Sequence, residues 1–226
     1  MLPIIKKEVK TYFLSPIAYV FIGIFALISS FVFYNTVLYP LNRFEEMFNI
    51  ISFLFLIIIP VLTMRMFSEE RKNGTEQLLY TSPRSITSIV LGKYFSAVIV
   101  MIIYEILLMV YGGILLILGQ LNIGTTLIAL MGLLFLAMAD ISFGMFISSL
   151  TENQIIAGIV TMAGLIIMFL IPTVNTNLLR FSIIDVFWTT FSKGIITIQG
   201  SFLLLSFSML FITLTIISIN RRKKLK

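Results

Sequence analysis

Residues 60–93 read PVLTMRMFSEERKNGTEQLLYTSPRSITSIVLGK, and they separate two long apolar runs. The run before them ends near Met64, and the next one begins near Tyr94. Charged side chains are costly in hydrocarbon, so this stretch is expected to lie at a membrane surface between two membrane-spanning helices. It is also the only polar segment between apolar runs with a cluster of charges of both signs. We therefore expect a soluble partner to attach there.

The composition of the whole chain agrees with a membrane protein. Of its 226 residues, 59% are hydrophobic and only 12% are charged, whereas a soluble domain averages about 25% charged residues. The chain has no cysteine and no histidine, which excludes disulfides, thiolate metal sites and the usual zinc ligand. Acid–base or metal chemistry would have to use ten carboxylates, so we expect neither an enzyme nor a cofactor on this chain.

Six apolar stretches are each long enough to cross a hydrocarbon core, which takes about 20 helical residues. The runs are continuous rather than alternating, which favours helices over strands. The predicted fold class is therefore an all-α integral membrane protein, with residues 1–226 forming one transmembrane domain. The predicted spans are residues 17–39, 48–66, 94–118, 125–150, 155–172 and 199–220.

Basic residues predict the orientation of these spans. With a cytoplasmic N-terminus, the inner segments carry 13 of the 16 lysines and arginines, including the basic C-terminal tail. The positive-inside rule then places both termini in the cytoplasm. A basic tail beside an apolar span indicates anionic lipid as its partner, not nucleic acid.

Two segments outside the spans have a pattern of their own. Residues 1–16 predict an amphipathic interfacial helix with its lysines toward lipid headgroups. Its apolar face is expected to hold Leu2, Ile5, Val9, Tyr12 and Phe13, and its opposite face Lys6, Lys7 and Lys10. Residues 173–198 are rich in aromatic side chains, which fits either an interfacial belt or a short re-entrant helical pair.

The long loop contains helix signals over residues 68–85. Asn73-Gly74 predicts a left-handed stop, and Thr75 can cap a new helix with Glu76 in its first turn. Residues 78–80 are apolar, and Ser82-Pro83 can open a helix that leads into the third span. These signals predict a short, partly apolar helix suited to docking in a cleft of another protein. The alternative is a solvated loop that only connects two spans.

The sequence resembles the membrane subunit of ABC-2 type transporters, particularly the branch named for gliding-motility and nitrous-oxide-operon permeases. The resemblance covers nearly the whole chain and rests on three stretches. They are LTMRMFSEERKNGTEQLLYTSPRSITSIVLGKYFSA at residues 62–97, FISSLTENQIIAGIVT at residues 146–161 and FSKGII at residues 191–196.

The resemblance implies a function that composition does not show. Two such subunits, identical or different, form a dimer around the substrate path in the plasma membrane, here of a bacterium. A separate cytoplasmic ATPase subunit, which holds ATP and Mg, contacts the loop after the second span. Closure of that subunit moves spans 2 and 5, and the expected direction of transport is export. By carry-over, the ATPase-coupling residues are Glu69, Glu70, Arg71, Gly74, Thr75, Leu78, Leu79 and Pro83. The chain itself lacks a phosphate-binding loop, because Tyr94 follows Gly92-Lys93 and no glycine stands five residues before Gly92.

Glu105 and Asp140 are the only acids inside the predicted spans, each about eleven residues from the predicted cytoplasmic end of its helix. At about 1.5 Å per residue, both are expected near the midplane, where the neutral acid is favoured. If the side chains meet, they can share a proton and line or gate the substrate path. The structural alternative is a protonated acid hydrogen-bonded to Tyr104, Ser142 or a neighbouring helix.

Two other classes of function therefore stay open. A secondary transporter would use Glu105 and Asp140 for ion coupling and would not need the long loop. A non-transporting membrane anchor would need the loop for a cytoplasmic partner but would move no substrate. The sequence does not identify a substrate.

Overall fold

The computed structural model describes residues 1–38, 44–77, 84–117, 122–174 and 182–225, and these residues contain helices and turns but no strand. Six helices of this described part are long and apolar enough to cross a membrane, which confirms the predicted class. They are α2 (Pro16–Leu38), α3 (Phe44–Thr63), α6 (Ile86–Ile117), α7 (Ile123–Leu150), α8 (Gln154–Val174) and α10 (Ile198–Leu225). The shorter elements are α1 (Leu2–Leu14), α4 (Ser68–Lys72), α9 (Ile183–Thr189) and the 3₁₀ turn η2 (Phe191–Lys193).

The largest error in the predicted spans is at the start of the third one. Helix α6 begins at Ile86, eight residues before the predicted boundary at residue 94. The Ser85 hydroxyl accepts a hydrogen bond from the Ser88 backbone N–H at 3.3 Å and so caps the first turn. Helix α3 ends at Thr63, three residues earlier than predicted.

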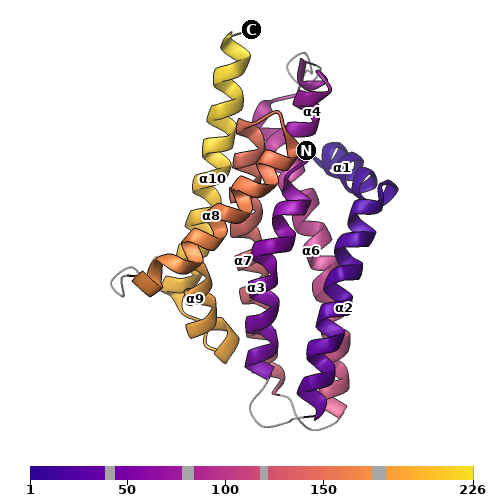
Figure 1. Ribbon diagram of the computed structural model, residues 1–226, viewed down its shortest axis with the longest axis vertical. Helices are drawn as coiled ribbons and strands as arrows, with labels where there is room; N and C mark the ends of the chain where they lie inside the picture. The colour runs from indigo at the N-terminus through magenta and orange to yellow at the C-terminus, as the bar shows by residue number, and fades with distance from the viewer. Residues whose placement is uncertain (39–43, 78–83, 118–121, 175–181, 226) are drawn as a thin grey trace.

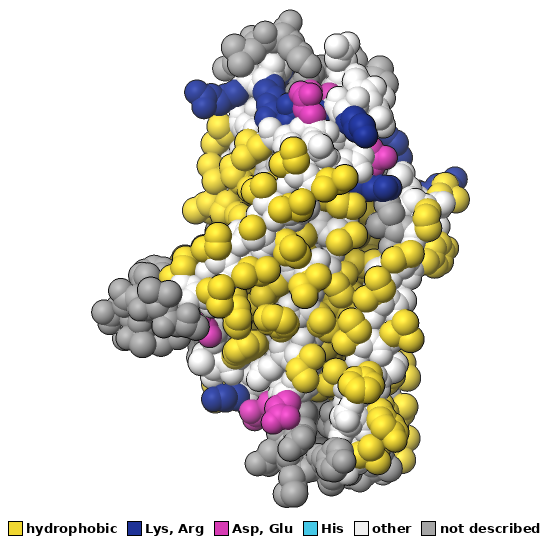
Figure 2. All heavy atoms as spheres, in the orientation of Figure 1, with side chains coloured by type: hydrophobic (Ala, Val, Ile, Leu, Met, Phe, Trp, Pro, Cys, Tyr) yellow, Lys and Arg dark blue, Asp and Glu magenta, His cyan; other side chains and the backbone are white. Residues whose placement is uncertain are grey.

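Helix α7 lies at the centre of the bundle. Residues 139–142 are four successive buried residues, which requires neighbours around the whole circumference of the helix. Those neighbours are α3, α6, α8 and α10. Figure 1 shows both chain ends and α4 at one end of the bundle, called here the α4 end. In Figure 2 apolar side chains cover the middle of the molecule, and the visible charged side chains gather toward its two ends.

Helix α1 packs against the start of α6. The Cβ of any residue replacing Gly92 would lie 2.6 Å from the Ile4 side chain, so only glycine permits this close approach. The half-buried residues of α1 include Ile5, Val9, Tyr12 and Phe13, as predicted. Leu2 is 79% exposed, and it lines a shallow surface hollow together with Ile5, Val9 and Phe13. Glu8 is half-buried, because its carboxylate pairs with a buried lysine.

The aromatic segment before α10 folds inward. Phe187 in α9 and Phe191 in η2 are buried, and a Cβ at Gly132 of α7 would overlap the Phe191 ring. The Trp188 indole N–H donates to the Ser52 hydroxyl of α3 at 2.7 Å. The segment thus forms a short helix and a 3₁₀ turn that pack against α3 and α7.

Candidate functional site: the surface around α4

The turn between α3 and α4 is held by one side chain of α7. The Ser148 hydroxyl accepts hydrogen bonds from the backbone N–H groups of Phe67 and Ser68, at 3.1 and 3.2 Å. The same hydroxyl donates to the Met64 carbonyl at 3.1 Å. One serine therefore satisfies two unpaired backbone N–H groups at the start of α4 and shares the Met64 carbonyl with the Ser68 hydroxyl, and it fixes α4 on the end of α7.

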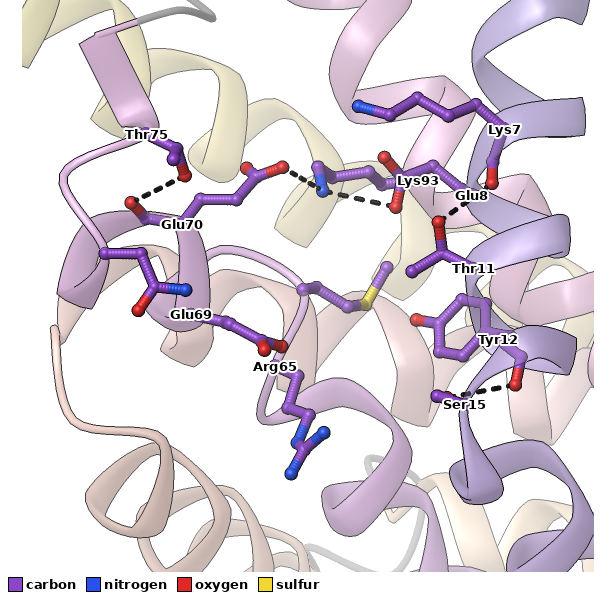
Figure 3. A pocket seen from close by; sticks show the side chains of 12 residues that line it. Lys7, Glu8, Thr11, Tyr12, Ser15, Arg65, Glu69, Glu70, Thr75 and Lys93 are labelled. Carbon is purple, nitrogen blue, oxygen red and sulfur yellow. Dashed lines mark hydrogen bonds and ion pairs between the residues drawn. The ribbon is translucent and has the colours of Figure 1, made fainter.

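A buried lysine joins α4 to two other helices. Lys93 of α6 is only 4% exposed, and its ammonium lies 2.8 Å from Glu70 of α4 and 3.3 Å from Glu8 of α1. The ammonium also lies 5.4 Å from the centre of the Phe67 ring, within the range of a cation–π contact. Figure 3 shows both carboxylates converging on it. We call Lys93, Glu70 and Glu8 the lysine triad.

Two arginines converge on the end of α7. The Arg71 guanidinium of α4 donates to the Ser149 carbonyl at 3.3 Å and to Glu152 at 3.0 Å. The Arg222 guanidinium of α10 donates to the carbonyls of Ser149 and Leu150, at 2.6 and 3.2 Å. The last carbonyls of a helix lack partners within the helix and carry partial negative charge, so two cations stabilise this end. The turn between α7 and α8 is thereby connected to both α4 and α10.

Several of the predicted loop features lie within the described residues. Gly74 has φ +70°, which confirms the left-handed stop predicted at Asn73-Gly74. The Thr75 hydroxyl donates to the Glu70 carbonyl at 3.2 Å, and the chain is helical again at residues 76–77. The predicted coupling residues Leu78, Leu79 and Pro83 lie outside the described residues.

The described coupling residues differ in how open they are to a partner. Residues 72–75 form an exposed tip beyond α4. Glu70 faces Lys93, and Arg71 faces the α7–α8 turn, so both side chains are bonded within the chain. Glu69 lines a pocket instead. The arrangement provides an exposed tip on a base that is bonded to α6 and α7, and through Lys93 to α1.

The pocket lies between α1 and α4 and has a volume of about 300 Å³. We call it the α1–α4 pocket. Its lining includes three bases and three acids, so the formal charges balance: Lys7, Arg65, Lys93, Glu8, Glu69 and Glu70. Burial and the negative charges of Glu8, Glu69 and Glu70 raise the pKa of Tyr12, which also lines it.

The two span acids are not brought together. Asp140 lies ten residues before the end of α7, whereas Glu105 lies nineteen residues after the start of α6. Both of these helix ends belong to the α4 end, so the acids differ in depth by roughly 13 Å. Glu105 therefore lies farther from the start of its helix than expected, because α6 begins eight residues before the predicted boundary.

The expected hydrogen bonds to Tyr104 and Ser142 are absent as well. Tyr104 and Ser29 share a 2.7 Å hydrogen bond between their hydroxyls, and Ser142 donates to the Ala139 carbonyl of its own helix. Both carboxylate oxygens of Asp140 and one oxygen of Glu105 are buried without a hydrogen-bond partner in the described part of the chain. Such groups favour the neutral acid.

Sequence reasoning did not identify four of the residues that hold this site: Glu8, Lys93, Ser148 and Arg222. Two of them carry a weak signal. Glu8 is the only acid among the first 44 residues, and Lys93 stands between long apolar runs. Ser148 and Arg222 look like an ordinary helix serine and part of a basic tail.

Comparison with known proteins places most of this architecture in one family. Residues 2–180 match the family described as ABC-2 type transporter. This range covers more than three quarters of the chain, including α1, the lysine triad, the loop and the α7–α8 turn. A search among curated proteins finds no match for the chain.

Proposed function

Because the chain belongs to the ABC-2 type transporter family, we propose that it is a permease whose α4 end binds a separate ATPase subunit in the cytoplasm. The family assignment itself makes the chain a transmembrane subunit of an ABC transporter and a multi-pass membrane protein. Membrane subunits of this family generally work with an ABC ATPase. The further steps of the proposal concern the docking surface, the orientation and the transmission of force.

The construction of the α4 surface is the observation that supports the docking site best. Residues 72–75 are exposed, while the base beneath them is bonded to α6 and α7, and through Lys93 to α1. Glu70 pairs with Lys93 of α6, Arg71 contacts the end of α7, and Ser148 caps the start of α4. A solvated connector needs no such attachment. A segment that receives force from a partner must pass it on, and a rigid base does so.

The attachments suggest the route of that force. A push on α4 would act on α1 and α6 through the lysine triad, and on the α7–α8 turn through Arg71. Family resemblance implies movement of spans 2 and 5, which correspond to α3 and α8. In this chain α8 would be reached through the turn that contains Glu152, and α3 through the Ser148 cap.

Charge distribution supports a cytoplasmic α4 end. Helix α1, α4 and the C-terminal end of α10 lie at this end in Figure 1, and these segments contain most of the basic residues of the chain. The positive-inside rule applies to such segments. We extend the proposal to a dimer of two permease subunits in a bacterial plasma membrane, working as an exporter of the gliding-motility and nitrous-oxide-operon branch. ATP and Mg would be held by the partner ATPase.

The test is affinity purification of the full chain from its native membrane in mild detergent, with ATPase activity measured on the complex. The variant Leu78→Asp/Leu79→Asp places two charges in the proposed docking helix. A matched control, Leu2→Asp, adds a charge to a side chain that is 79% exposed at the same end. We expect an ATP-hydrolysing subunit with the wild type and the control, and its loss from the double variant. A folded double variant that keeps the ATPase would refute the docking site.

A second candidate function is ion-coupled transport through Asp140 or Glu105. Both are buried carboxylates, and the oxygens named above have no hydrogen-bond partner among the described residues. An ion-coupled transporter would use one of them separately, since their depths differ. Substrate flux in vesicles should then depend on a proton gradient and disappear in Glu105→Gln or Asp140→Asn. Flux that needs ATP and survives both substitutions leaves only the ABC mechanism.

A further inference from the structure

An apolar groove runs between α2 and α3 and ends at a single charged residue. Its volume is about 510 Å³, and among the described residues that line it Arg65 is the only one with a charged side chain. The lining extends from Pro16 to Ile28 on α2, and from Leu54 on α3 to Arg65 in the turn after it. At about 1.5 Å per residue, these segments are roughly 16–18 Å long, close to one leaflet of a hydrocarbon core about 30 Å thick.

Arg65 is available to a ligand at the upper end of this groove. Its guanidinium makes no hydrogen bond or ion pair with any described residue, and its Nε is buried without a partner. Figure 3 shows the guanidinium pointing away from Lys93 and Glu70. An arginine at the level of lipid headgroups is suited to a phosphate, because the planar guanidinium can donate two parallel hydrogen bonds.

The α1–α4 pocket adjoins the groove, because Arg65 lines both. Glu69 stands one helical turn after Arg65 and has no ion-pair partner among the described residues. One oxygen of Glu70 in the same pocket is also buried and unpaired. The pocket therefore offers acceptors for a cation beside the free guanidinium, and its balanced charge suits a zwitterion better than a ligand with net negative charge.

We propose that the groove holds an acyl chain of an ethanolamine phospholipid, whose phosphate binds Arg65 and whose ammonium lies against Glu69. The match in length, the arginine at one end of the groove and the acceptors beyond it all indicate the same ligand. A choline headgroup carries no N–H donor for the carboxylates, and a glycerol headgroup carries no cation. The site needs only this chain, so it is independent of ATPase docking.

Native mass spectrometry of the detergent-purified full chain tests the site. Ethanolamine, choline and glycerol phospholipids with identical acyl chains are titrated separately. Arg65→Gln removes the phosphate contact, Glu69→Gln the ammonium contact, and Ile24→Trp fills the groove. Ile106→Trp is the matched control, because Ile106 is 56% exposed on α6, outside the groove.

We expect the wild type and Ile106→Trp to bind the ethanolamine lipid preferentially. Arg65→Gln should weaken binding of every lipid by about tenfold, the effect of losing a charge-assisted hydrogen bond. Glu69→Gln should abolish the preference for ethanolamine over choline, and Ile24→Trp should weaken binding of all three lipids.

Unchanged binding in both Arg65→Gln and Ile24→Trp overturns the site. Equal or tighter binding of the glycerol lipid by the wild type overturns the proposed headgroup. Loss of a dimer with unchanged lipid binding in Ile24→Trp would assign the groove to a second copy of the chain.

Discussion

Replacing Lys93 with methionine should destabilise the α4 end, because it leaves two carboxylates without their cation. The lysine side chain is 5% exposed, and those of Glu8 and Glu70 are 16% and 22% exposed. Removing one partner of a fully buried ion pair costs about 3–5 kcal/mol, whereas a solvent-exposed pair contributes about 0–1 kcal/mol. The partial exposure of the two acids reduces the expected loss to about 2–4 kcal/mol.

The measurement is unfolding in mixed micelles, followed by the fluorescence of Trp188, the only tryptophan of the chain. A loss of this size corresponds to a fall in Tm of about 5–15 °C. The decisive control is the triple variant Lys93→Met/Glu8→Gln/Glu70→Gln, which removes the unpaired charges together with the lysine. We expect it to recover to within about 1 kcal/mol of the wild type, because an apolar or neutral replacement of a buried ion cluster is often close to neutral.

Two results would refute this reasoning. If the single variant is as stable as the wild type, the lysine triad contributes nothing to the α4 end. If the triple variant is as unstable as the single one, the stability comes from packing of the lysine stem and its contact with the Phe67 ring, not from charge.

Three further predictions concern packing, capping and pH. Gly132→Ala should lower the free energy of unfolding by about 1–3 kcal/mol, because the new Cβ would overlap Phe191. The control is Gly23→Ala, whose Cβ would meet no atom within 4 Å and should not destabilise the protein. Thermal unfolding of the two variants measures the difference. Ser148→Ala should cost about 1–3 kcal/mol and speed amide exchange at the start of α4, because two N–H groups lose their acceptor. The pKa of Tyr12 is raised in the folded state, so the folded protein holds the phenol proton more tightly than the unfolded chain. The contribution of Tyr12 to folding stability is therefore complete below the unfolded pKa of about 10, and it falls as the pH rises further. Tyr12→Phe should remove this part of the fall in stability above about pH 10. An unchanged dependence of the free energy of unfolding on pH in this variant would contradict the prediction.

The six spans were predictable because their signal is local. About 20 consecutive apolar residues define a crossing helix wherever the partners lie, and the runs predicted here correspond to α2, α3, α6, α7, α8 and α10. The left-handed turn was predictable because its signal is local as well. Gly74 has φ +70°, and glycine is one of the few residue types that adopt such an angle without strain.

The errors arose where a charged residue has distant partners. Lys93 marked the predicted start of the third span at residue 94, because an unpaired lysine is costly in an apolar helix. Its partners Glu8 and Glu70 lie 85 and 23 residues away in the chain, so no local pattern shows that the lysine is compensated. The distance of Glu105 from the start of its helix was underestimated for the same reason. The Ser148 cap is equally invisible, since it bonds to backbone groups that lie about 80 residues away.

The dipeptide Gly92-Lys93 explains why α1 belongs to the proposed coupling route. Gly92 lets the Ile4 side chain approach the α6 backbone, and this approach places Glu8 within 3.3 Å of the Lys93 ammonium. The same ammonium binds Glu70, so α1 and α4 share one counter-ion. A displacement of α4 would therefore act on Lys93 through Glu70, and on α1 through the Glu8 that shares the same ammonium. Helix α1 and the start of α6 would move together with α4, while the Arg71 contact would carry the displacement to the turn between α7 and α8.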